Sequence, residues 1–406
     1  MSVRPRAHGP DGLPLPGPNQ QTGAIVIGGD YRALAVVRSL GRHGIPVWLV
    51  TDDHWIAGAS RYVRRRLHMP SGGPLAELHF LEHLAAEGTT AGWTLIPTND
   101  HGAELIARHR RRLAKDFIVS VPEWETLRWA HDKRLTYALA DRVGVDHPWT
   151  LAPASETELA RATGHFPVIV KPAFKPAINA LTSAKAWRAD DARSLVEAYR
   201  AACELVPSEA VLIQELIAGD GVSQLSYAAL AVDGRPVASL CARRLRQWPI
   251  TIGRSSTYVE TIEAPDIEQA AELLIDAMHF TGLLEIEFKR DPSSGTLKLL
   301  DINPRVWGWH GIGPAAGVDF PYLLWRALHM EPVVPVRGAP GVRWMRLTTD
   351  LAVVLKEIIR GRLSIGSYLR SFRPPVESAI FAWDDPVPGL LDVPQFLHLI
   401  VGRGGL

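Results

Sequence analysis

Two apolar stretches near residue 300 constrain the fold most, because both carry acidic residues at alternate positions. They are LLEIEFKRD, residues 283–291, and TLKLLDINPR, residues 296–305. A Pro-Ser-Ser-Gly turn separates them, and its last residue, Gly295, readily adopts a positive φ. This pattern predicts two strands joined as a β-hairpin.

The register of the hairpin decides which acids meet. If Pro292 pairs with Thr296, four polar side chains share one face: Glu287 opposite Asp301, and Glu285 opposite Asn303. Three carboxylates on one face repel one another unless a cation or water screens them. Such hard oxygen ligands suit Mg²⁺ that also carries a substrate phosphate. A solvated strand face is the alternative, but Arg305 supplies the fixed positive charge that phosphoryl transfer needs.

Length and composition exclude several classes of protein. A chain of 406 residues with 47% hydrophobic content can bury large cores in two or three domains. The formal net charge is +1, so no overall field attracts nucleic acid or a membrane, and no apolar run reaches membrane-spanning length. Two cysteines are too few for a disulfide framework, which favours a reducing, cytoplasmic compartment.

We expect four segments along the chain. Residues 1–22 are rich in Pro and Gly and form a disordered tail. Residues 23–120 form a doubly wound α/β domain, and residues 121–330 form the domain with the acidic hairpin. Residues 331–406 form a mostly helical extension that packs on the core or makes a dimer contact. Within it, DDPVPGLLDVPQF is too rich in proline for one helix.

The first ordered segment has the pattern of a βαβ unit. A β-branched run, AIVIGGD at residues 24–30, precedes a helical stripe and a second run at residues 45–50. Glycines after the first strand suggest dinucleotide binding, with Asp52 or Asp53 on a ribose. The Gly-x-Gly-x-x-Gly series is missing, however, so we expect no dinucleotide in this domain.

A later strand of this segment, WTLIPTND at residues 93–100, ends in polar residues. Ligands bind at the carboxyl ends of strands in open sheets, so Thr98, Asn99 and Asp100 are candidate substrate contacts. A helix cap by Thr98 or Asn99 explains the same residues equally well.

Two lysines of the second segment occupy positions where an anion would be expected. Lys133 lies in the first turn of a helix over residues 132–143, where a cation opposes the helix dipole. Lys171 ends the buried-type strand FPVIVKP, residues 166–172, where it can deliver a point charge to a phosphate. A solvent-exposed position is the alternative for each lysine.

A third buried strand, AVLIQELI at residues 210–217, leads into the loop Ala-Gly-Asp-Gly. The backbone of this loop can offer a donor and an acceptor to an adenine edge. A hairpin about Asp233 and Gly234 then joins strands over residues 225–232 and 236–242.

Five motifs therefore occur in one order along the chain. They are Asp132-Lys133, Val-Ile-Val-Lys171-Pro, Ile-Gln214-Glu215-Leu-Ile217, Glu287-Phe and Asp301-Ile-Asn303-Pro-Arg305. In this order they resemble the ATP-grasp superfamily of carboxylate–amine ligases, and the subgroup of predicted ATP-dependent carboligases with D-aspartate ligase-like proteins in particular. The resemblance covers nearly the whole chain. It implies an α/β ATP-grasp fold, in which two α+β subdomains clamp ATP, preceded by a doubly wound pre-ATP-grasp domain.

The resemblance also implies a role for each motif residue. The ATP contacts would be Lys133 and Lys171 on the phosphates, and Gln214, Glu215 and Ile217 at adenine. The ligands of Mg²⁺, for which Mn²⁺ can substitute, would be Glu287, Asp301 and Asn303. Arg305 would stabilise the transferred phosphoryl group. Family members phosphorylate a small-molecule carboxylic acid with ATP and then let an amine attack the acyl phosphate, from which water must be excluded.

The chain departs from the family pattern in its phosphate loop. Relatives usually have a glycine-rich loop here, but AFKPAINALTSAK, residues 173–185, contains no glycine. Loop closure would then depend on other side chains: Asn179, Thr182, Ser183 or Lys185.

Two further departures concern ribose and metal. Many relatives place an acid on the ribose where Val222 and Ser223 stand, which leaves Asp220 as the nearest candidate. Asp301 occupies a position where Glu is commoner, and its shorter side chain could hold one metal less tightly.

Substrate-binding residues are expected in two places. The run CARRLRQWP, residues 241–249, carries three arginines, of which Arg243 shares strand parity with Cys241 and Ser239. We predict that Arg243 faces the site and binds a carboxylate or phosphate, the alternative being a solvated basic edge. The second place is beside the acyl acceptor, where aromatic core packing is the alternative for three residues: Trp307, Trp309 and His310.

Three functions remain open at this point. The first is an ATP- and Mg²⁺-dependent ligase that joins a small carboxylate to an amine. The second is a non-catalytic ATP sensor or partner-binding protein, which the glycine-free loop and missing ribose acid favour. The third is carboxylation through carboxyphosphate, as in relatives of biotin carboxylase. Neither nucleic acid nor membrane is an expected partner, and a homodimer is left open.

Overall fold

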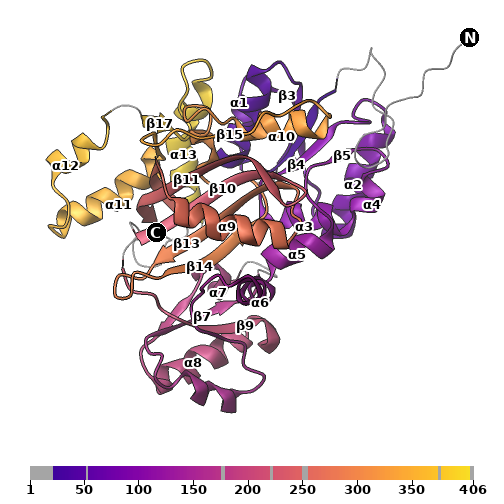
Figure 1. Cartoon of the computed structure of the whole chain (residues 1–406). Helices are drawn as coiled ribbons and strands as arrows, with labels where there is room; N and C mark the ends of the chain where they lie inside the picture. Colours follow the sequence, from indigo (N-terminus) through magenta and orange to yellow (C-terminus); the bar gives the residue numbers. More distant parts are fainter. Residues whose placement is uncertain are drawn as a thin grey trace, which may run out of the picture.

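Three β-sheets organise the chain in the computed structural model, which describes residues 22–51, 54–174, 179–219, 223–248, 255–373 and 376–402. The sheets follow one another along the sequence, and helices pack against them (Figure 1). The predicted boundaries near residues 22, 120 and 330 stay predictions.

The first sheet is parallel and has the strand order β3-β2-β1-β4-β5. Its strands are β1 (Ala24–Ile27), β2 (Val47–Thr51), β3 (Val63–His68), β4 (Thr94–Pro97) and β5 (Ile118–Val119). The helices between them are α1 (Tyr31–Arg42), α2 (Pro74–Ala86), α3 (Asp100–Arg108) and α4 (Arg110–Leu113). Strands β1, β2 and β4 are buried throughout, as parallel strands covered on both faces must be. The predicted doubly wound α/β domain is confirmed.

The second sheet is small and antiparallel, with the order β6-β9-β7-β8. Its strands are β6 (Thr150–Leu151), β7 (Val168–Pro172), β8 (Trp187–Ala189) and β9 (Val211–Glu215), and its helices are α7 (Ala180–Ala184) and α8 (Ala192–Cys203). Helices α5 (Trp124–His131) and α6 (Lys133–Val143) precede it. Asp132 caps α6 by accepting from the Arg134 amide, and Gly144 ends the helix in the left-handed conformation.

The third sheet is the largest and contains the acidic hairpin. Its path is β14-β13-β10-β11-β12-β16-β17, with β15 paired to β11. The strands are β10 (Gln224–Val232), β11 (Arg235–Trp248), β12 (Ser255–Ile262), β13 (Gly282–Arg290), β14 (Leu297–Asn303), β15 (Val336–Arg337), β16 (Arg343–Met345) and β17 (Val376–Ser378). Helix α9 (Pro265–Ala277) covers one face, and α10 (Phe320–Leu328) and α1 share a core with the other.

The C-terminal segment contributes strands β15 to β17 and three helices: α11 (Leu347–Ile359), α12 (Ile365–Arg370) and α13 (Val387–Gly402). The prediction that proline prevents one helix over DDPVPGLLDVPQF is wrong, because α13 contains most of it. Pro388 lies in the first turn, where proline removes no intrahelical hydrogen bond, whereas Pro394 lies inside the helix and has no N–H to donate. The Thr348 hydroxyl donates to the Asp392 carboxylate at 2.7 Å. No helix within the described ranges combines the length and apolarity needed to cross a bilayer.

The hairpin of β13 and β14 has the predicted register at its acids. Glu287 pairs with Asp301. The turn itself closes one residue earlier than predicted, since the Asp291 amide donates to the Thr296 carbonyl at 2.9 Å. A bulge at Leu300 compensates for this difference and restores the pairing.

The hairpin of β10 and β11 turns at Asp233 and Gly234, as predicted, but it also contains a bulge. Ala231 pairs with Pro236 and Leu230 with Ala238, so Val237 has no partner. One extra residue reverses the facing of every later side chain in a strand. Strand β11 therefore presents Arg244, rather than Arg243, on the face that carries Glu287.

Candidate functional site

One cleft between the small sheet and the large sheet gathers most of the predicted site residues. Strands β7 and β9 line it on one side, β13 and β14 on the other, and the start of α6 closes one end. The predicted residues that line it are Lys133, Lys171, Gln214, Glu215, Ile217, Glu287, Asp301 and Asn303.

Lys171 lies at the inner end of β7 with its ammonium group buried. Its Nζ donates to the Gln214 Oε1 at 2.7 Å and to the Tyr137 hydroxyl at 3.0 Å. Burial, followed by the nearby charge of Lys133, holds the pKa of Lys171 well below its usual range. An anion in the cleft would favour the charged form, so this lysine is suited to binding phosphate.

Lys133 begins α6 and reaches across to the large sheet. Its Nζ lies 2.5 Å from the Asp301 Oδ1, and both side chains are largely buried. The ion pair joins one predicted phosphate ligand to one predicted metal ligand.

The segment after β9 is held by lysines from the hairpin. Lys298 contacts the Glu215 carboxylate. Lys289 donates to the carbonyls of Ile217 and Gly219, each at 3.0 Å. The side chain of Gln214 is occupied by Lys171 and Thr150, so an adenine here would contact mainly the backbone of residues 215–217.

Glu287 lies on the cleft face of β13 with polar partners around it. Gln224 donates to its Oε2 at 2.8 Å, and Arg244 Nη2 lies 3.5 Å from its Oε1. Arg244 is itself buried and donates to Ser256 and Gln224, both at 2.8 Å. A fixed cation therefore compensates the buried carboxylate.

Glu285 lies deeper on the same face. Trp309 Nε1 donates to it at 2.8 Å, and the Asn303 amide donates at 3.2 Å. Burial, and then repulsion from Glu287, raise the pKa of Glu285 to about 7. Trp309 is thus a polar neighbour of the acids as well as part of a core.

Arg305 connects the hairpin to the first sheet. Its Nη2 donates to the Asn303 Oδ1 at 3.2 Å, and its Nε donates to the Asp100 Oδ1 at 2.6 Å. Asp100 begins α3, directly after Asn99, which caps that helix by accepting from Gly102 at 2.7 Å. The cap prediction for Asn99 is confirmed, and Asp100 positions the guanidinium of Arg305.

The donor set on the hairpin fits a hard divalent cation. Glu287 and Asp301 are opposite one another on neighbouring strands, and Asn303 follows two residues later. Within the described residues, no three His, Cys, Asp or Glu side chains lie close enough to form a metal site by themselves. A cation here would therefore need phosphate or water oxygens in addition, which is the usual situation of Mg²⁺.

Sequence comparison identifies the superfamily. Residues 212–349 match a family described as "ATP-grasp in the biosynthetic pathway with Ter operon". The D-aspartate ligase of Enterococcus faecium (strain Aus0004) is 24% identical over 234 residues, which is 52% of this chain and 53% of that protein. The chain therefore matches an ATP-grasp family over residues 212–349. It spans about half the length of this curated relative.

Two solved structures support the ATP-grasp fold. Biotin carboxylase from Campylobacter jejuni, described as a beta-gamma-ATP complex, superposes with a TM-score of 0.63 at 14% identity, covering 80% of this chain and 75% of that one. The L-amino acid ligase of Bacillus licheniformis gives a TM-score of 0.56 at 15% identity, covering 76% and 75%. At such identities the likeness shows the fold, which is the predicted one, and leaves the substrate open.

The prediction that Arg243 faces the site is wrong. Its guanidinium donates to the Glu260 carboxylate on β12, at 2.6 Å from Nη2, and it is nearly half exposed. Ser239, Cys241 and Arg243 do share one face of β11, but the Val237 bulge shifts the register with β10 by one residue, so this face is opposite to the one that carries Glu287. Arg244 is the residue that the structure brings to Glu287.

Other predicted residues fall inside and outside the cleft. Thr182 and Lys185 line it, while Asn179 caps α7 through a reciprocal pair of hydrogen bonds with Thr182. Asp220, the candidate for ribose, lies outside the described residues, as do Asp52, Asp53 and residues 175–178 of the glycine-free loop.

The aromatic residues after Arg305 divide between core and site. Trp307 is fully buried in the core shared by α1 and the large sheet. His310 is buried with its Nε2 3.0 Å from the Arg32 carbonyl, and burial lowers its pKa to about 4. The structural alternative therefore describes His310 and Trp307 better than a role beside the acceptor.

The sequence reasoning missed several cleft residues. Gln224, Gln247, Lys289 and His131 line the cleft, and Arg244 contacts Glu287. Arg244 could have been found only by counting paired residues from Glu287 on β13 across β10 to β11. The unpaired Val237 shifts that count by one residue, and nothing in the sequence marks it.

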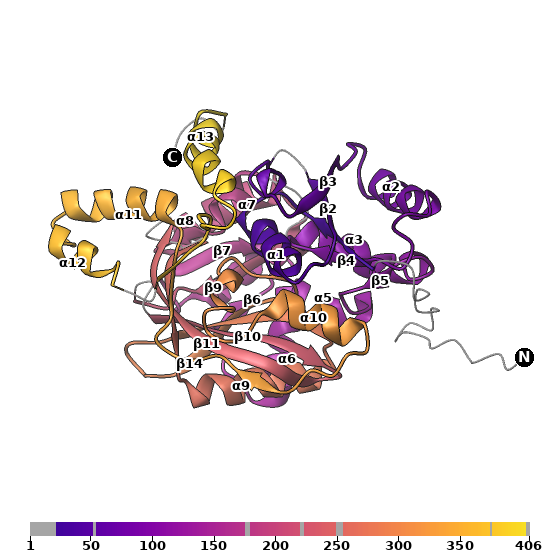
Figure 2. The same ribbon diagram turned by 90° about the horizontal axis from the view of Figure 1, so that it is seen from above.

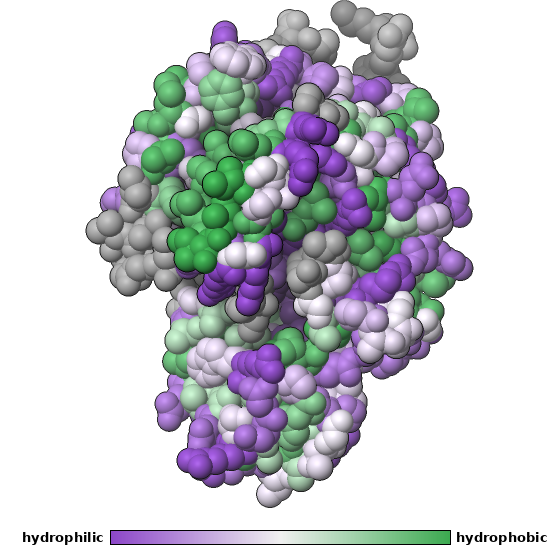
Figure 3. Space-filling view, turned by 90° about the vertical axis from the view of Figure 1, so that its left-hand side faces the viewer, coloured by the Kyte–Doolittle hydropathy of each residue, from purple (hydrophilic) through white to green (hydrophobic). Residues whose placement is uncertain are grey.

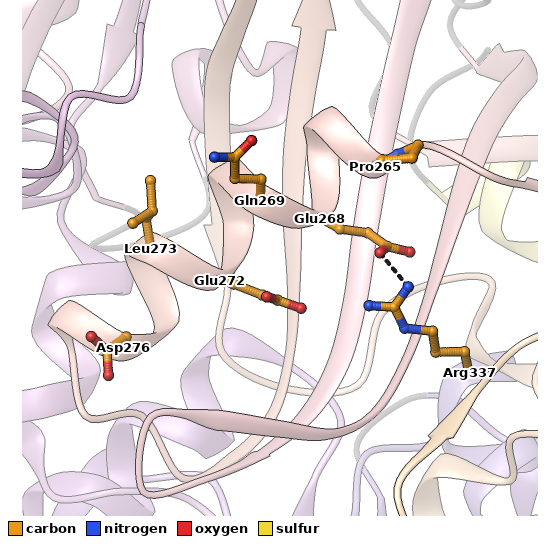
Figure 4. A pocket seen from close by; sticks show the side chains of 7 residues that line it. All are labelled: Pro265, Glu268, Gln269, Glu272, Leu273, Asp276 and Arg337. Carbon is orange, nitrogen blue, oxygen red and sulfur yellow. Dashed lines mark ion pairs between the residues drawn. The ribbon is translucent and has the colours of Figure 1, made fainter.

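A second hollow lies between α9 and Arg337 of β15, and none of the predicted residues lines it. Its lining is acidic along the helix, with Glu268, Glu272 and Asp276 at successive turns (Figure 4). Arg337 of β15 forms an ion pair with Glu268 at 2.8 Å, while Asp276 is exposed.

Proposed function

We propose that this ATP-grasp enzyme is an ATP- and Mg²⁺-dependent ligase that activates a small carboxylic acid as an acyl phosphate and joins it to an amine. One observation carries the proposal: two lysines, two opposed carboxylates and an asparagine line one cleft between two sheets, and Arg305 donates to that asparagine. Phosphoryl transfer needs positioning and charge neutralisation, and these groups supply both.

The nucleotide would lie with adenine against residues 215–217 and with its phosphates toward Lys133 and Lys171. Lys289 supports this assignment because it donates to the carbonyl of Ile217, in the segment that adenine would contact, and to that of Gly219, two residues later. The buried Lys171 gains its charge most readily beside an anion. Asp220 is the proposed ribose contact on sequence grounds alone.

Glu287, Asp301 and Asn303 would hold Mg²⁺, which when bound would neutralise charge on the phosphate oxygens. Arg305 would face the phosphoryl group in transfer. Its ion pair with Asp100 and its hydrogen bond to Asn303 fix the guanidinium before substrate arrives, so little reorganisation is needed.

The reaction would proceed in two balanced steps. A carboxylate oxygen attacks the γ-phosphorus of ATP, the bond to the β-phosphate oxygen breaks, and ADP leaves. The amine nitrogen then attacks the acyl carbon, inorganic phosphate leaves, and the nitrogen loses a proton. Closure of the cleft must exclude water, because the acyl phosphate would otherwise be hydrolysed.

Carboxylation through carboxyphosphate is the second candidate, and the likeness to biotin carboxylase favours it. Bicarbonate would then be the phosphorylated acid. A non-catalytic ATP-binding protein is the third reading, supported by the absence of glycine from residues 173–185.

A screen of carboxylic acids for ADP release tests the proposal. We expect ADP only with the correct acid, and hydroxylamine should trap the acyl phosphate as a hydroxamate. ADP release that depends on bicarbonate alone would favour carboxylation. Tight ATP binding without turnover on any acid would contradict both enzymatic readings.

Arg305→Ala separates an enzyme from a binder. For an enzyme, turnover should fall by a factor on the order of 10³, since an arginine on the transferred phosphoryl group is worth that much. Arg243→Ala is the matched control, because Arg243 pairs with Glu260 away from the cleft, and it should leave turnover within about twofold. A pure binder would keep its nucleotide affinity in both variants.

A further inference from the structure

The exposed apolar side chains of this protein are concentrated in its C-terminal segment. Of the eighteen large hydrophobic residues that are exposed in the described part of the chain, twelve lie between residues 347 and 393. Isolated exposed apolar residues are normal on a protein surface, but a contiguous group marks an interaction site.

Helices α11 and α12 carry the most regular part of this group. In α11 four residues at intervals of four form one exposed stripe: Leu347, Leu351, Leu355 and Ile359. The opposite face of α11 is buried through Val353 and Val354. Ile365 and Leu369 continue the pattern on α12, and both are 63% exposed.

The two helices project from the body of the molecule (Figure 2). The view of this side shows a broad hydrophobic area bordered by hydrophilic side chains (Figure 3). The stripe is therefore accessible and lies on a protruding part of the fold.

The hydrophilic border is strongly basic. Residues 356–373 contain five cationic side chains and a single carboxylate, Glu357, although the whole chain has a net charge of only +1. Arg360 and Arg362 both approach Glu357, at 3.5 and 4.0 Å, so this one acid leaves most of the charge uncompensated. The other cations are Lys356, Arg370 and Arg373.

We infer that helices α11 and α12 dock on an anionic lipid surface, with the apolar stripe inserted at the level of the head groups and the basic residues against lipid phosphates. An apolar face flanked by Lys and Arg is the composition of helices that lie in a membrane interface without crossing it.

A second copy of the chain fits this surface less well. A symmetric contact through α11 and α12 would bring two sets of five cations together, and like charges at an interface oppose association. The basic residues favour an anionic binding partner. A lipid surface can also bury the aliphatic stripe, because apolar contact with acyl chains needs no matching hydrogen bonds.

Vesicle co-sedimentation of the full chain tests the inference, with phosphatidylcholine vesicles compared with vesicles that contain about one third phosphatidylglycerol. We expect at least ~10-fold stronger partitioning to the anionic vesicles, weakened by 0.5 M salt because the charge contribution is screened (~4 Å Debye length). Equal partitioning to both vesicles, or none, would overturn the inference. The assay needs no nucleotide, so it is independent of the proposed ligase activity.

Matched variants locate the contact. Ile359→Ser with Leu369→Ser should reduce partitioning by about tenfold or more, because two exposed aliphatic side chains no longer insert. Leu75→Ser with Val334→Ser removes side chains of similar exposure elsewhere and should have no effect. Equal losses in the two double variants would contradict the assignment.

Charge variants separate lipid from self-association. Arg360→Gln with Arg370→Gln should weaken binding to anionic vesicles severalfold, while Arg188→Gln with Arg193→Gln on the small-sheet domain should not. Sedimentation velocity supplies the decisive alternative: a concentration-dependent dimer abolished by the Ile359 and Leu369 changes, without vesicle binding, would overturn the lipid proposal.

Discussion

The β13–β14 hairpin and helix α9 each bring three carboxylates to one face, but their surroundings differ. On the hairpin, Glu285 and Glu287 are buried, and Asp301 is largely covered by its contact with Lys133. On α9 the acids line a surface hollow (Figure 4), in which Glu268 and Glu272 are partly buried and Asp276 is exposed.

The difference in surroundings decides which of the two sets of acids can take part in catalysis or metal binding. Regular spacing is common to both: alternate residues on the strands and every fourth residue on the helix. The hairpin acids also have a buried arginine, two lysines and an indole N–H directed at them or their neighbours. Desolvation makes each of those interactions strong, whereas exposed pairs contribute little.

The largest expected difference concerns turnover. Glu287→Gln should lower acid-dependent ADP release by about 10²-fold or more, because a buried carboxylate proposed as a metal ligand loses its charge. Glu272→Gln on α9 is the matched control and should leave the rate unchanged. A Glu287 variant that retains full activity would remove the distinction between the two sets.

Removing the arginine beside each set of acids should change the stability of the protein to very different extents. Arg244→Met leaves Glu287 buried without its arginine and should cost about 3 kcal/mol of unfolding free energy. Arg337→Met removes the partner of Glu268 on α9 and should cost less than about 0.5 kcal/mol. Urea unfolding of both variants measures the contrast, and similar midpoints would contradict it.

The pH dependence of stability distinguishes the two sets again. The pKa of Glu285 is raised to about 7 by burial and Glu287, whereas an unfolded Glu titrates near ~4.3. The folded state therefore binds the extra proton, so the contribution of Glu285 is complete below pH ~4 and is lost as the pH rises through about 7.

Glu285→Gln keeps the neutral form at every pH. We expect the variant to match the native protein at pH 4.5 and to exceed its stability at pH 8 by on the order of 2 kcal/mol. Thermal unfolding at both pH values measures this, and a variant destabilised equally at both would show that the neutral form is not the one the fold favours.

The smallest effect is expected on α9 itself. Glu268→Gln breaks an ion pair whose arginine is 69% exposed, so the unfolding free energy should change by less than ~0.5 kcal/mol at any ionic strength. A larger loss would mean that the α9 acids form a coupled network.

The sequence predicted the hairpin acids because alternation is a local property. Glu287 pairs with Asp301 as counted, even though the turn closes at Asp291 and Thr296. The agreement depends on Leu300, whose bulge cancels the displacement of the turn. The prediction was right at the acids and wrong in the four residues that lead to them.

The arginine of β11 shows the limit of the same reasoning. No local pattern marks Val237 as an extra residue, because bulges follow from sheet twist and tertiary packing. Because of this residue, Arg244 lies beside Glu287, while Arg243 pairs with Glu260 on the other face. The contact of Asp100 with Arg305 could not be predicted from a local pattern either, because 205 residues separate them.

The ion pair of Lys133 and Asp301 has a consequence for ligand binding. A divalent cation at Asp301 competes with the lysine, and a phosphate at Lys133 competes with the carboxylate. A cation alone would bind Asp301 and leave Lys133 without its carboxylate, and a phosphate alone would bind Lys133 and leave Asp301 without its lysine. When both ligands bind, each side chain has a partner of opposite charge. Their affinities are therefore linked, and by thermodynamic reciprocity each should raise the affinity for the other by the same factor.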